Sequence, residues 1–135
     1  MRFLLSVGFV LLLGLLLPLT SKAQAPLSSL SEQQVRTLLC HSWKVVTMVA
    51  EKRRMPAAAF GGMSTTFKAD GTQTSVAAGE ANKGTWRYAH NTHTLTTHDR
   101  DGIEDHTILR ISSRELVVRS TFQGMFMDMI MQRTD

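Results

Sequence analysis

The sequence predicts an all-β protein, an eight-stranded antiparallel up-and-down barrel with a short N-terminal helix. From Trp43 onward, apolar and polar residues alternate with period two, the pattern of half-buried strands. Eight runs of this kind are separated by turn sequences such as Asp70-Gly71 and Asp101-Gly102. No helical stretch long enough for a crossover lies between them, so neighbouring strands are expected to pair antiparallel. Eight such strands are enough to close a barrel.

The first 23 residues are predicted to be a secretory signal peptide. Arg2 supplies a positive charge, residues 3–19 are almost wholly apolar, and small residues at 21–25 provide a cleavage site, which we place after Ala23. A retained anchor is the alternative, since about 20 apolar residues can cross a bilayer. Gly14 and Pro18 favour cleavage. We therefore expect a periplasmic or secreted protein with no transmembrane segment after cleavage.

The composition describes one small domain with little net charge. Of the 15 basic residues, Arg2 and Lys22 lie in the leader, which leaves 13 against 11 acidic ones. This balance gives no support for a nucleic-acid partner. Cys40 is the only cysteine, so the domain has no intrachain disulfide and is held by its core. Its apolar neighbours predict a buried thiol rather than a nucleophile.

Residues 24–42 are expected to form a polar lead and one short helix. Ser31 is suited to the N-cap and Gln34, three residues later, completes a capping box. Glu32 places negative charge at the helix N-terminus, where the helix dipole favours it. Val35 and Leu39 share one apolar face, and the helix is expected to end near residue 40.

Residues 43–135 are assigned to the barrel. The expected strands span residues 43–50, 63–68, 72–78, 84–89, 93–98, 103–111, 115–121 and 125–133. One connection, EKRRMPAAAFGG at residues 51–62, is far longer than the others. Pro56 and two glycines argue against a strand there, while Phe60 and its neighbours are apolar. The segment is therefore either a lid over the barrel mouth or a surface Ω-loop packed on its own side chains.

The alternation also predicts which side chains point into the barrel. In the last strand four methionines occupy one face, and the other face carries Asp128 and Gln132, which belong outside. The expected inner residues are Val45, Thr47, Thr65, Phe67, Trp86, Tyr88, Leu95, Ile103, Asp105, Thr107, Leu109, Ile111, Leu116, Val118, Ser120, Met125, Met127, Met129 and Met131. Asp105 is anomalous, because a buried carboxylate needs a partner or water. The alternative is a bulge that turns it outward.

The methionine stripe has three explanations. A mostly apolar interior with a few polar groups is typical of a ligand cavity, and flexible thioethers would give it an adaptable wall. The methionines could instead simply fill a small barrel. The third explanation is a Cu(I) site of thioethers and imidazoles, but the five histidines lack the spacing of a metal site. No metal or cofactor is therefore predicted.

Short motifs add a family resemblance that covers residues 38–133. A helical turn leads into a strand that begins with tryptophan, TFKADGT follows at residues 66–72, and KGTWRY at residues 83–88. In these features the chain resembles the small exported lipocalin-like proteins of bacteria. The resemblance implies an eight-stranded barrel, a small apolar ligand and no catalytic residues. It also implies that Trp43 closes the barrel bottom under a late arginine, here Arg133, although His41 stands where the family has glycine.

The leading functional prediction is a non-enzymatic exported protein that binds a small hydrophobic or lipid-like molecule in the barrel. The predicted ligand-binding residues are Phe60, Phe67, Trp86, Tyr88, Leu95, Asp105, Leu116, Met125, Met127 and Met129. The alternative is a protein-interaction module of the cell envelope, an inhibitor or assembly factor, with a filled barrel and an apolar patch at residues 55–60 or around Phe126 and Ile130. An enzyme is disfavoured because paired carboxylates, a nucleophile elbow and a metal signature are all missing.

Overall fold

The computed structural model describes residues 26–60 and 62–135. The predicted signal peptide lies outside the described residues. The elements in chain order are η1 (Leu27–Ser29), α1 (Glu32–Leu39), β1 (Ser42–Ala50), β2 (Arg53–Pro56), η2 (Ala57–Phe60), β3 (Met63–Phe67), β4 (Thr72–Ala77), β5 (Glu80–Ala89), β6 (Thr94–Asp99), β7 (Gly102–Ile111), β8 (Glu115–Phe122) and β9 (Met125–Arg133).

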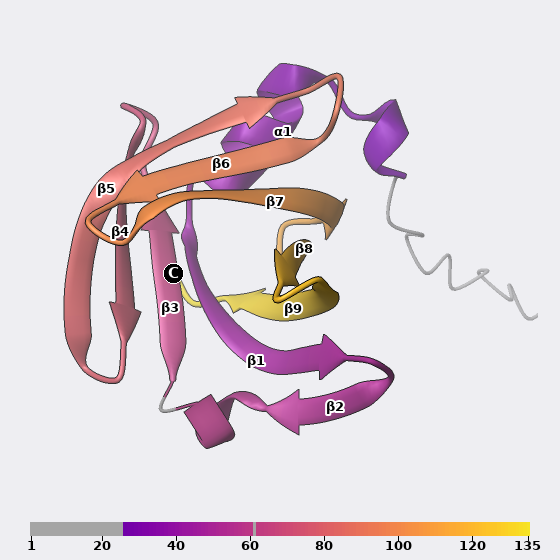
Figure 1. The fold of residues 1–135 in the computed structure, drawn as a ribbon. Coiled ribbons are helices and arrows are strands. Elements are labelled where there is room, and N and C mark those ends of the chain that lie inside the picture. Colours follow the sequence, from indigo (N-terminus) through magenta and orange to yellow (C-terminus); the bar gives the residue numbers. More distant parts are fainter. Residues whose placement is uncertain (1–25, 61) are drawn as a thin grey trace, which may run out of the picture.

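The strands form one closed antiparallel barrel (Figure 1). From β3 to β9 each strand pairs with the next one in sequence, and β1 pairs with β3 on one side and with β9 on the other. The β1–β9 pairing, with Val45 opposite Met131 and Met48 opposite Met129, closes the ring. Eight strands, β1 and β3–β9, therefore make the barrel, and the predicted up-and-down topology is confirmed.

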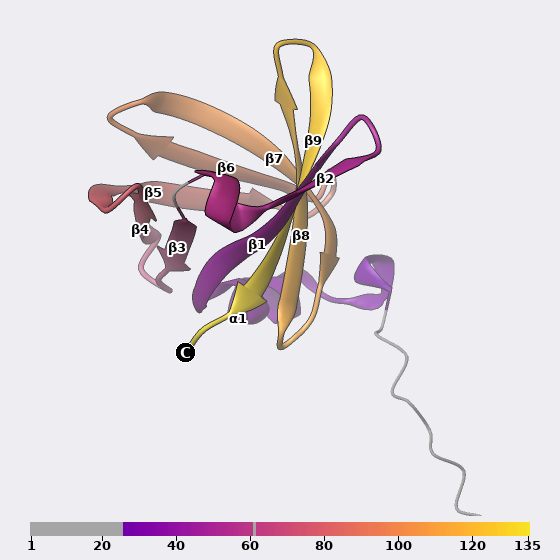
Figure 2. The same ribbon diagram turned by 90° about the horizontal axis from the view of Figure 1, so that it is seen from below.

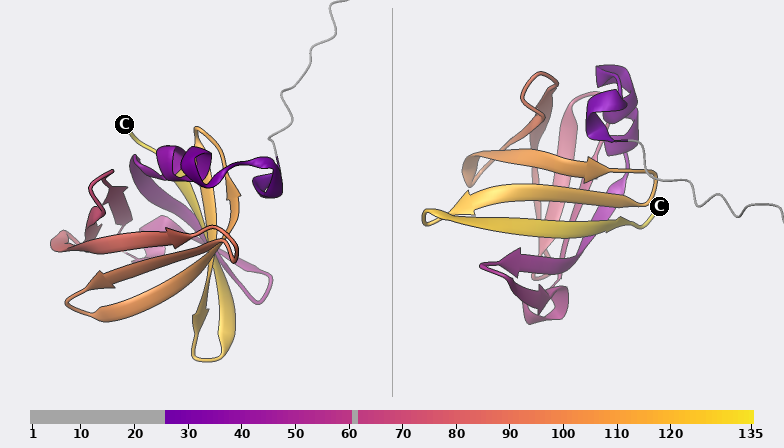
Figure 3. Two further views of the ribbon diagram at one scale, coloured as in Figure 1. Left: turned by 90° about the horizontal axis from the view of Figure 1, so that it is seen from above. Right: turned by 90° about the vertical axis from the view of Figure 1, so that its right-hand side faces the viewer.

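One prediction about the long connection was wrong. Residues 53–56 form a strand, β2, which pairs with the second half of β1 on the edge that β3 leaves after Lys44. Pro56 is the last residue of β2 and lies opposite Thr47. Proline is tolerated at such a place because an edge strand leaves one side of its backbone unpaired. The β1–β2 hairpin and η2 lie at the end of the molecule opposite α1 (Figures 1 and 3).

The helix α1 packs across the other end of the barrel. The capping box is confirmed, since the Gln34 backbone N–H donates to the Ser31 hydroxyl at 3.1 Å and the Ser31 N–H donates to the Gln34 side chain at 2.7 Å. Val35 and Leu39 are completely buried against the barrel core. The indole N–H of Trp43, also completely buried, donates to the Leu39 carbonyl at 3.0 Å. These contacts fix the helix to the first strand and fill this end of the barrel.

Glycine is not needed in the turn from α1 to β1. His41 donates its backbone N–H to the Leu39 carbonyl at 2.7 Å and accepts a backbone bond from Phe67. In residues 26–60 and 62–135, five non-glycine residues have a positive φ, and His41 is not one of them. The departure from the Gly-x-Trp pattern therefore causes no backbone strain.

The expected stacking of Arg133 on Trp43 is not formed. Arg133 lies opposite Trp43 in the β1–β9 register, but its guanidinium donates to Asp135 at 3.1 Å. The arginine that lies over an indole is Arg36 of α1, whose guanidinium carbon is 5.9 Å from the centre of the Trp86 ring. The same guanidinium donates to the carbonyl of Tyr88 at 3.1 Å. Arg36, from the N-terminal helix, thus covers the α1 end of the barrel, where the C-terminal Arg133 was expected.

Two β-bulges change the inner face. In β1 the register shifts between Val45 and Thr47, so Met48 turns inward and Thr47 lies opposite Ile130 on the outer face. The prediction that Thr47 points inward was wrong for this reason, because one extra residue reverses the alternation.

The second bulge, in β7, has the larger effect. The register shifts between Ile108 and Arg110, so Ile108 and Ile111 are both buried although they are three residues apart. Before the bulge the inner residues are therefore Glu104 and His106. The predictions that Ile103, Asp105 and Thr107 point inward were wrong: all three are exposed, and Leu109 is the extra residue of the bulge. The alternative offered for Asp105, a bulge that turns it outward, is confirmed. Only Ile111 of the expected β7 set is buried inside.

The remaining inner residues lie largely as predicted. The buried ones are Val45, Phe67, Trp86, Tyr88, Leu95, Leu116, Val118 and Met131. Thr65 lines the interior, and Ser120 bonds to the inner His106. Met127 and Met129 are half-buried against the core. Met125 departs from this pattern. It is 41% exposed beside the β8–β9 turn, because that hairpin extends beyond the closed part of the barrel (Figure 2).

Candidate functional site

A cavity of about 310 Å³ lies inside the barrel. It is bounded by strands β1 and β3–β9 and opens between the β4–β5 and β6–β7 turns, where Ala77, Glu80 and Asp101 line its mouth. Its volume falls at the low end of the range for small-molecule sites. The barrel is therefore hollow at this end and packed at the end that α1 covers.

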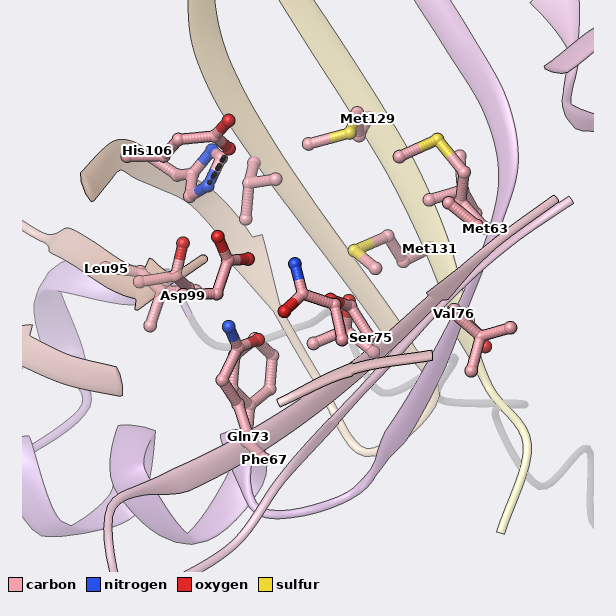
Figure 4. A pocket seen from close by; sticks show the side chains of 18 of the residues that line it. Met63, Phe67, Gln73, Ser75, Val76, Leu95, Asp99, His106, Met129 and Met131 are labelled. Atoms are coloured by element: carbon pink, nitrogen blue, oxygen red, sulfur yellow. Dashed lines mark ion pairs between the residues drawn. The ribbon is translucent and has the colours of Figure 1, made fainter. Parts of the chain in front are cut away.

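One side of the cavity is apolar and rich in sulfur. The apolar wall consists of Val45, Met63, Phe67, Leu95, Leu116, Val118, Met129 and Met131. Figure 4 shows Met63, Met129 and Met131 gathered on one side. Methionine has three rotatable bonds and a polarizable thioether, so it can repack around apolar groups of different shape. This side can adapt to an apolar ligand without moving the backbone.

The opposite side is polar. Figure 4 shows Gln73, Asp99 and His106 across the cavity from the three methionines. Gln73 lies opposite Phe67 in the β3–β4 register and is only 3% exposed. Asp99, at the end of β6, is half-buried and accepts a hydrogen bond from the Asp101 backbone N–H at 2.8 Å. The cavity is therefore amphipathic across its width.

His106 is held as a neutral side chain. Its ring hydrogen-bonds the Ser120 hydroxyl, and its other ring nitrogen is 3.6 Å from a carboxylate oxygen of Glu104. Burial lowers the pKa of His106, against the opposing effects of Glu104 and Asp105. Burial prevails because a charged imidazolium loses its hydration inside the barrel. At neutral pH the ring can exchange hydrogen bonds with a ligand but carries no charge.

The mouth is acidic. Four carboxylates line the cavity, from Glu80, Asp99, Asp101 and Glu104, against the single guanidinium of Arg100. Arg100 is already engaged, at 3.2 Å from Glu80 and 4.0 Å from Asp101. The lining therefore has a formal charge of −3 when His106 is neutral, and that charge is concentrated at the entrance.

Four of the predicted ligand-binding residues line the cavity: Phe67, Leu95, Leu116 and Met129. Two more point inward but pack beneath it. Trp86 contacts Phe67 edge-on, with 5.6 Å between ring centres, and donates its indole N–H to the Lys68 carbonyl at 2.8 Å. Tyr88 hydrogen-bonds His90 at 3.0 Å, and burial raises its pKa. Both residues hold the packed end together and do not line the cavity.

The other four lie elsewhere. Asp105 is on the outer face, where it accepts a hydrogen bond from the Thr96 hydroxyl at 2.6 Å. Met125 is exposed at the β8–β9 hairpin, and Met127 packs on the core away from the cavity lining. Phe60 is the last residue of η2, and its side chain lies outside the described part of the structure. The lid interpretation of that segment thus stays a prediction.

Of the polar side chains that line the cavity, only Thr65 was predicted to point inward. Gln73 could have been found from the sequence, because the Asp70-Gly71 turn places it opposite Phe67, which alternation had already assigned to the interior. For Glu104 and His106 the signal was indirect. An inward Asp105 would be a costly buried carboxylate, and the bulge offered as the alternative is the β7 bulge that turns Asp105 outward and these two residues inward. Asp99 lies just before the Asp101-Gly102 turn, where charged residues are typical of a solvated hairpin tip.

Other kinds of site find little support in residues 26–60 and 62–135. Within these ranges no group of three or more His, Cys, Asp or Glu side chains is arranged to hold a metal ion. Cys40 is half-buried, and burial raises the pKa of its thiol, which keeps it protonated at neutral pH. None of the helices described is both long and apolar enough to span a membrane.

Comparison with known proteins agrees with this architecture. The family profile of the lipocalin-like domain matches residues 39–118. A lipocalin-like protein from Bacteroides uniformis superposes with a TM-score of 0.55 at 11% identity, over 71% of this chain and 98% of that one. A DUF4847 family protein from Bacteroides vulgatus superposes with a TM-score of 0.52 at 16% identity, over 73% of this chain and 96% of that one. No curated protein matches the sequence. The chain, with its helix-capped eight-stranded barrel, belongs to the lipocalin-like family.

Proposed function

We propose that this protein is a non-enzymatic binding protein that holds one small, largely apolar molecule inside its barrel. The observation that carries this proposal is the cavity of about 310 Å³ next to the methionine wall. A core whose only task is to pack would fill such a space, because unfilled volume costs stability. The lipocalin-like fold is consistent with small-ligand binding.

The proposal includes export. The charged and apolar leader with its small-residue exit supports secretion to the periplasm or the medium. The expected result is a mature N-terminus at Gln24, obtained by mass spectrometry of protein from the envelope fraction of the native host. Full-length protein retained in the membrane fraction would contradict cleavage.

The binding test uses a neutral fluorescent probe, N-phenyl-1-naphthylamine, which brightens in apolar surroundings. Met129→Trp places a bulky ring into the cavity and is expected to abolish the fluorescence increase. Met125→Trp is the matched control, since it lies on the same strand outside the cavity lining. Circular dichroism would confirm that both variants keep the barrel. Equal probe binding by wild type and Met129→Trp would contradict binding inside the barrel.

A second candidate function is that of a protein-interaction module. Exposed apolar side chains on the β8–β9 hairpin favour it. Phe122, Met125 and Phe126 are 58%, 41% and 65% exposed around its turn. The guanidinium of Arg119 lies 5.2 Å from the Phe126 ring centre and pairs with Asp128 through two bonds of 2.7 and 3.0 Å. Phe126→Ser should then abolish capture of an envelope protein and leave probe binding unchanged, whereas unchanged capture would exclude this surface.

A further inference from the structure

We propose that the ligand is an amphiphile with a protonated amine head, which Gln73 and Asp99 hold, and a short apolar tail, which packs on the methionine wall. The proposal rests on the proposed binding function and names the chemical class of the ligand. It excludes fatty acids and other anionic lipids as preferred ligands. Three independent features of the cavity lead to it.

The first feature is the side chain of Gln73. It is 97% buried, yet its amide makes no hydrogen bond to any described residue. Among the described residues, no fully enclosed side-chain nitrogen or oxygen lacks a partner. The Gln73 amide therefore faces the open space of the cavity, which it also lines (Figure 4). An amide that faces the open space of a cavity keeps its donors and its acceptor available for water or for a polar group of a ligand.

The second feature is the charge of the lining. Arg100 lies 3.2 Å from Glu80 and 4.0 Å from Asp101, and burial favours the neutral form of His106. None of the described residues that line the cavity therefore offers a free positive charge. A carboxylate head would enter a space of formal charge −3 without a cation to receive it. An ammonium head would enter the same field attractively, most of all close to the half-buried Asp99, since the exposed carboxylates are screened by solvent.

The third feature is the position of Asp99. It lies on the same side of the cavity as Gln73, opposite Met63 and Met131 (Figure 4). Its carboxylate accepts one backbone hydrogen bond, from Asp101, and a carboxylate can accept about four. Gln73 contributes an amide oxygen as a further acceptor. An ammonium group, which has only donors, fits two acceptors on one side of the cavity while its tail crosses to the thioethers on the other.

The experiment compares three probes that share one tail: octylammonium, octanol and octanoate, titrated into the mature protein by calorimetry at neutral pH. Octylammonium is expected to bind about tenfold more tightly than octanol, and octanoate more weakly than octanol. In Asp99→Asn the affinity for octylammonium should fall close to the affinity for octanol. Asp105→Asn is the matched control, since it removes the same charge from the outer face. Gln73→Leu replaces the amide with an apolar side chain of similar shape. It should weaken the binding of octylammonium more than it changes the binding of octanol.

The outcomes separate the two proposals. Equal binding of all three probes, or tightest binding of octanoate, would overturn the amine assignment and leave the binding function standing. An unchanged preference in Asp99→Asn would overturn the role of Asp99. If no probe binds and N-phenyl-1-naphthylamine also fails to bind, the binding function itself is wrong. Urea unfolding of each variant distinguishes a lost contact from a lost fold.

Discussion

The imidazole of His106 on β7 and the hydroxyl of Ser120 on β8 hydrogen-bond to each other on the inner face of the barrel. The His106 side chain is only 12% exposed, so the pair forms part of the barrel interior. Two neutral groups satisfy each other there without introducing a charge. Protonation of the ring would place a cation in a site that burial disfavours, and this gives the fold a measurable dependence on pH.

We expect the protein to lose stability as the pH falls below about 6.5, the ordinary pKa of histidine. The pKa of His106 is lower in the folded state, so the unfolded chain binds the proton more readily. The contribution of neutral His106 to the free energy of unfolding is fully present above the unfolded-state pKa. It is lost as the pH falls through the lowered pKa of the folded state. Urea unfolding across this range should show a shallower pH slope for His106→Asn. Identical slopes would contradict the assignment, and His98→Asn, on an exposed position, is the control.

Gly84, the glycine of the KGTWRY motif, is expected not to tolerate a side chain. A Cβ at this position would collide with the backbone carbonyl of His98 and lie 2.9 Å from the Cβ of Asp99. These are atoms of the neighbouring strand β6 and cannot rotate away. Gly84→Ala should lower the free energy of unfolding by about 3 kcal/mol. Thr85→Ala, on the exposed face next to it, should change it little, and an equal effect of the two would refute the steric argument.

Trp43 is expected to be the largest single contributor to the packed end. It is fully buried and joins β1 to α1 through its bond to the Leu39 carbonyl. Trp43→Ala should therefore cost about 3–5 kcal/mol. Amide hydrogen exchange should also quicken in α1 before it does in β8. Arg133→Ala is the informative comparison, because Arg133 pairs with Asp135 and not with the indole. A loss of similar size there would show that the arginine does support Trp43.

The fold was predictable because its signals are local. Alternation, turn dipeptides and the Ser31–Gln34 capping box each depend on a few neighbouring residues. The bulge residue Val46 gave no such signal, because a bulge is decided by how two strands meet. The bulge at Leu109 was indicated only by the anomalous inward position expected for Asp105. Strand β2 was missed for a similar reason, since it exists only by pairing along the edge that β3 leaves free.

The site was predictable only in its apolar half. Apolar residues show their burial through periodicity, so Phe67, Leu95, Leu116 and Met129 were found. Polar residues in a cavity break the same pattern and look like surface residues. Met125 shows the opposite error. It continues the methionine stripe, but the stripe extends past the point where the barrel closes, and strand length alone does not reveal where that point lies.

The lone thiol of Cys40 has a practical consequence. A domain with one cysteine cannot form an intrachain disulfide, so it needs no oxidant or disulfide isomerase to reach its native state. We therefore expect residues 24–135, made without the leader, to fold as well in a reducing cytosol as in an oxidising compartment. The proposed export would then bring the barrel to its proposed ligand and would have no part in its maturation.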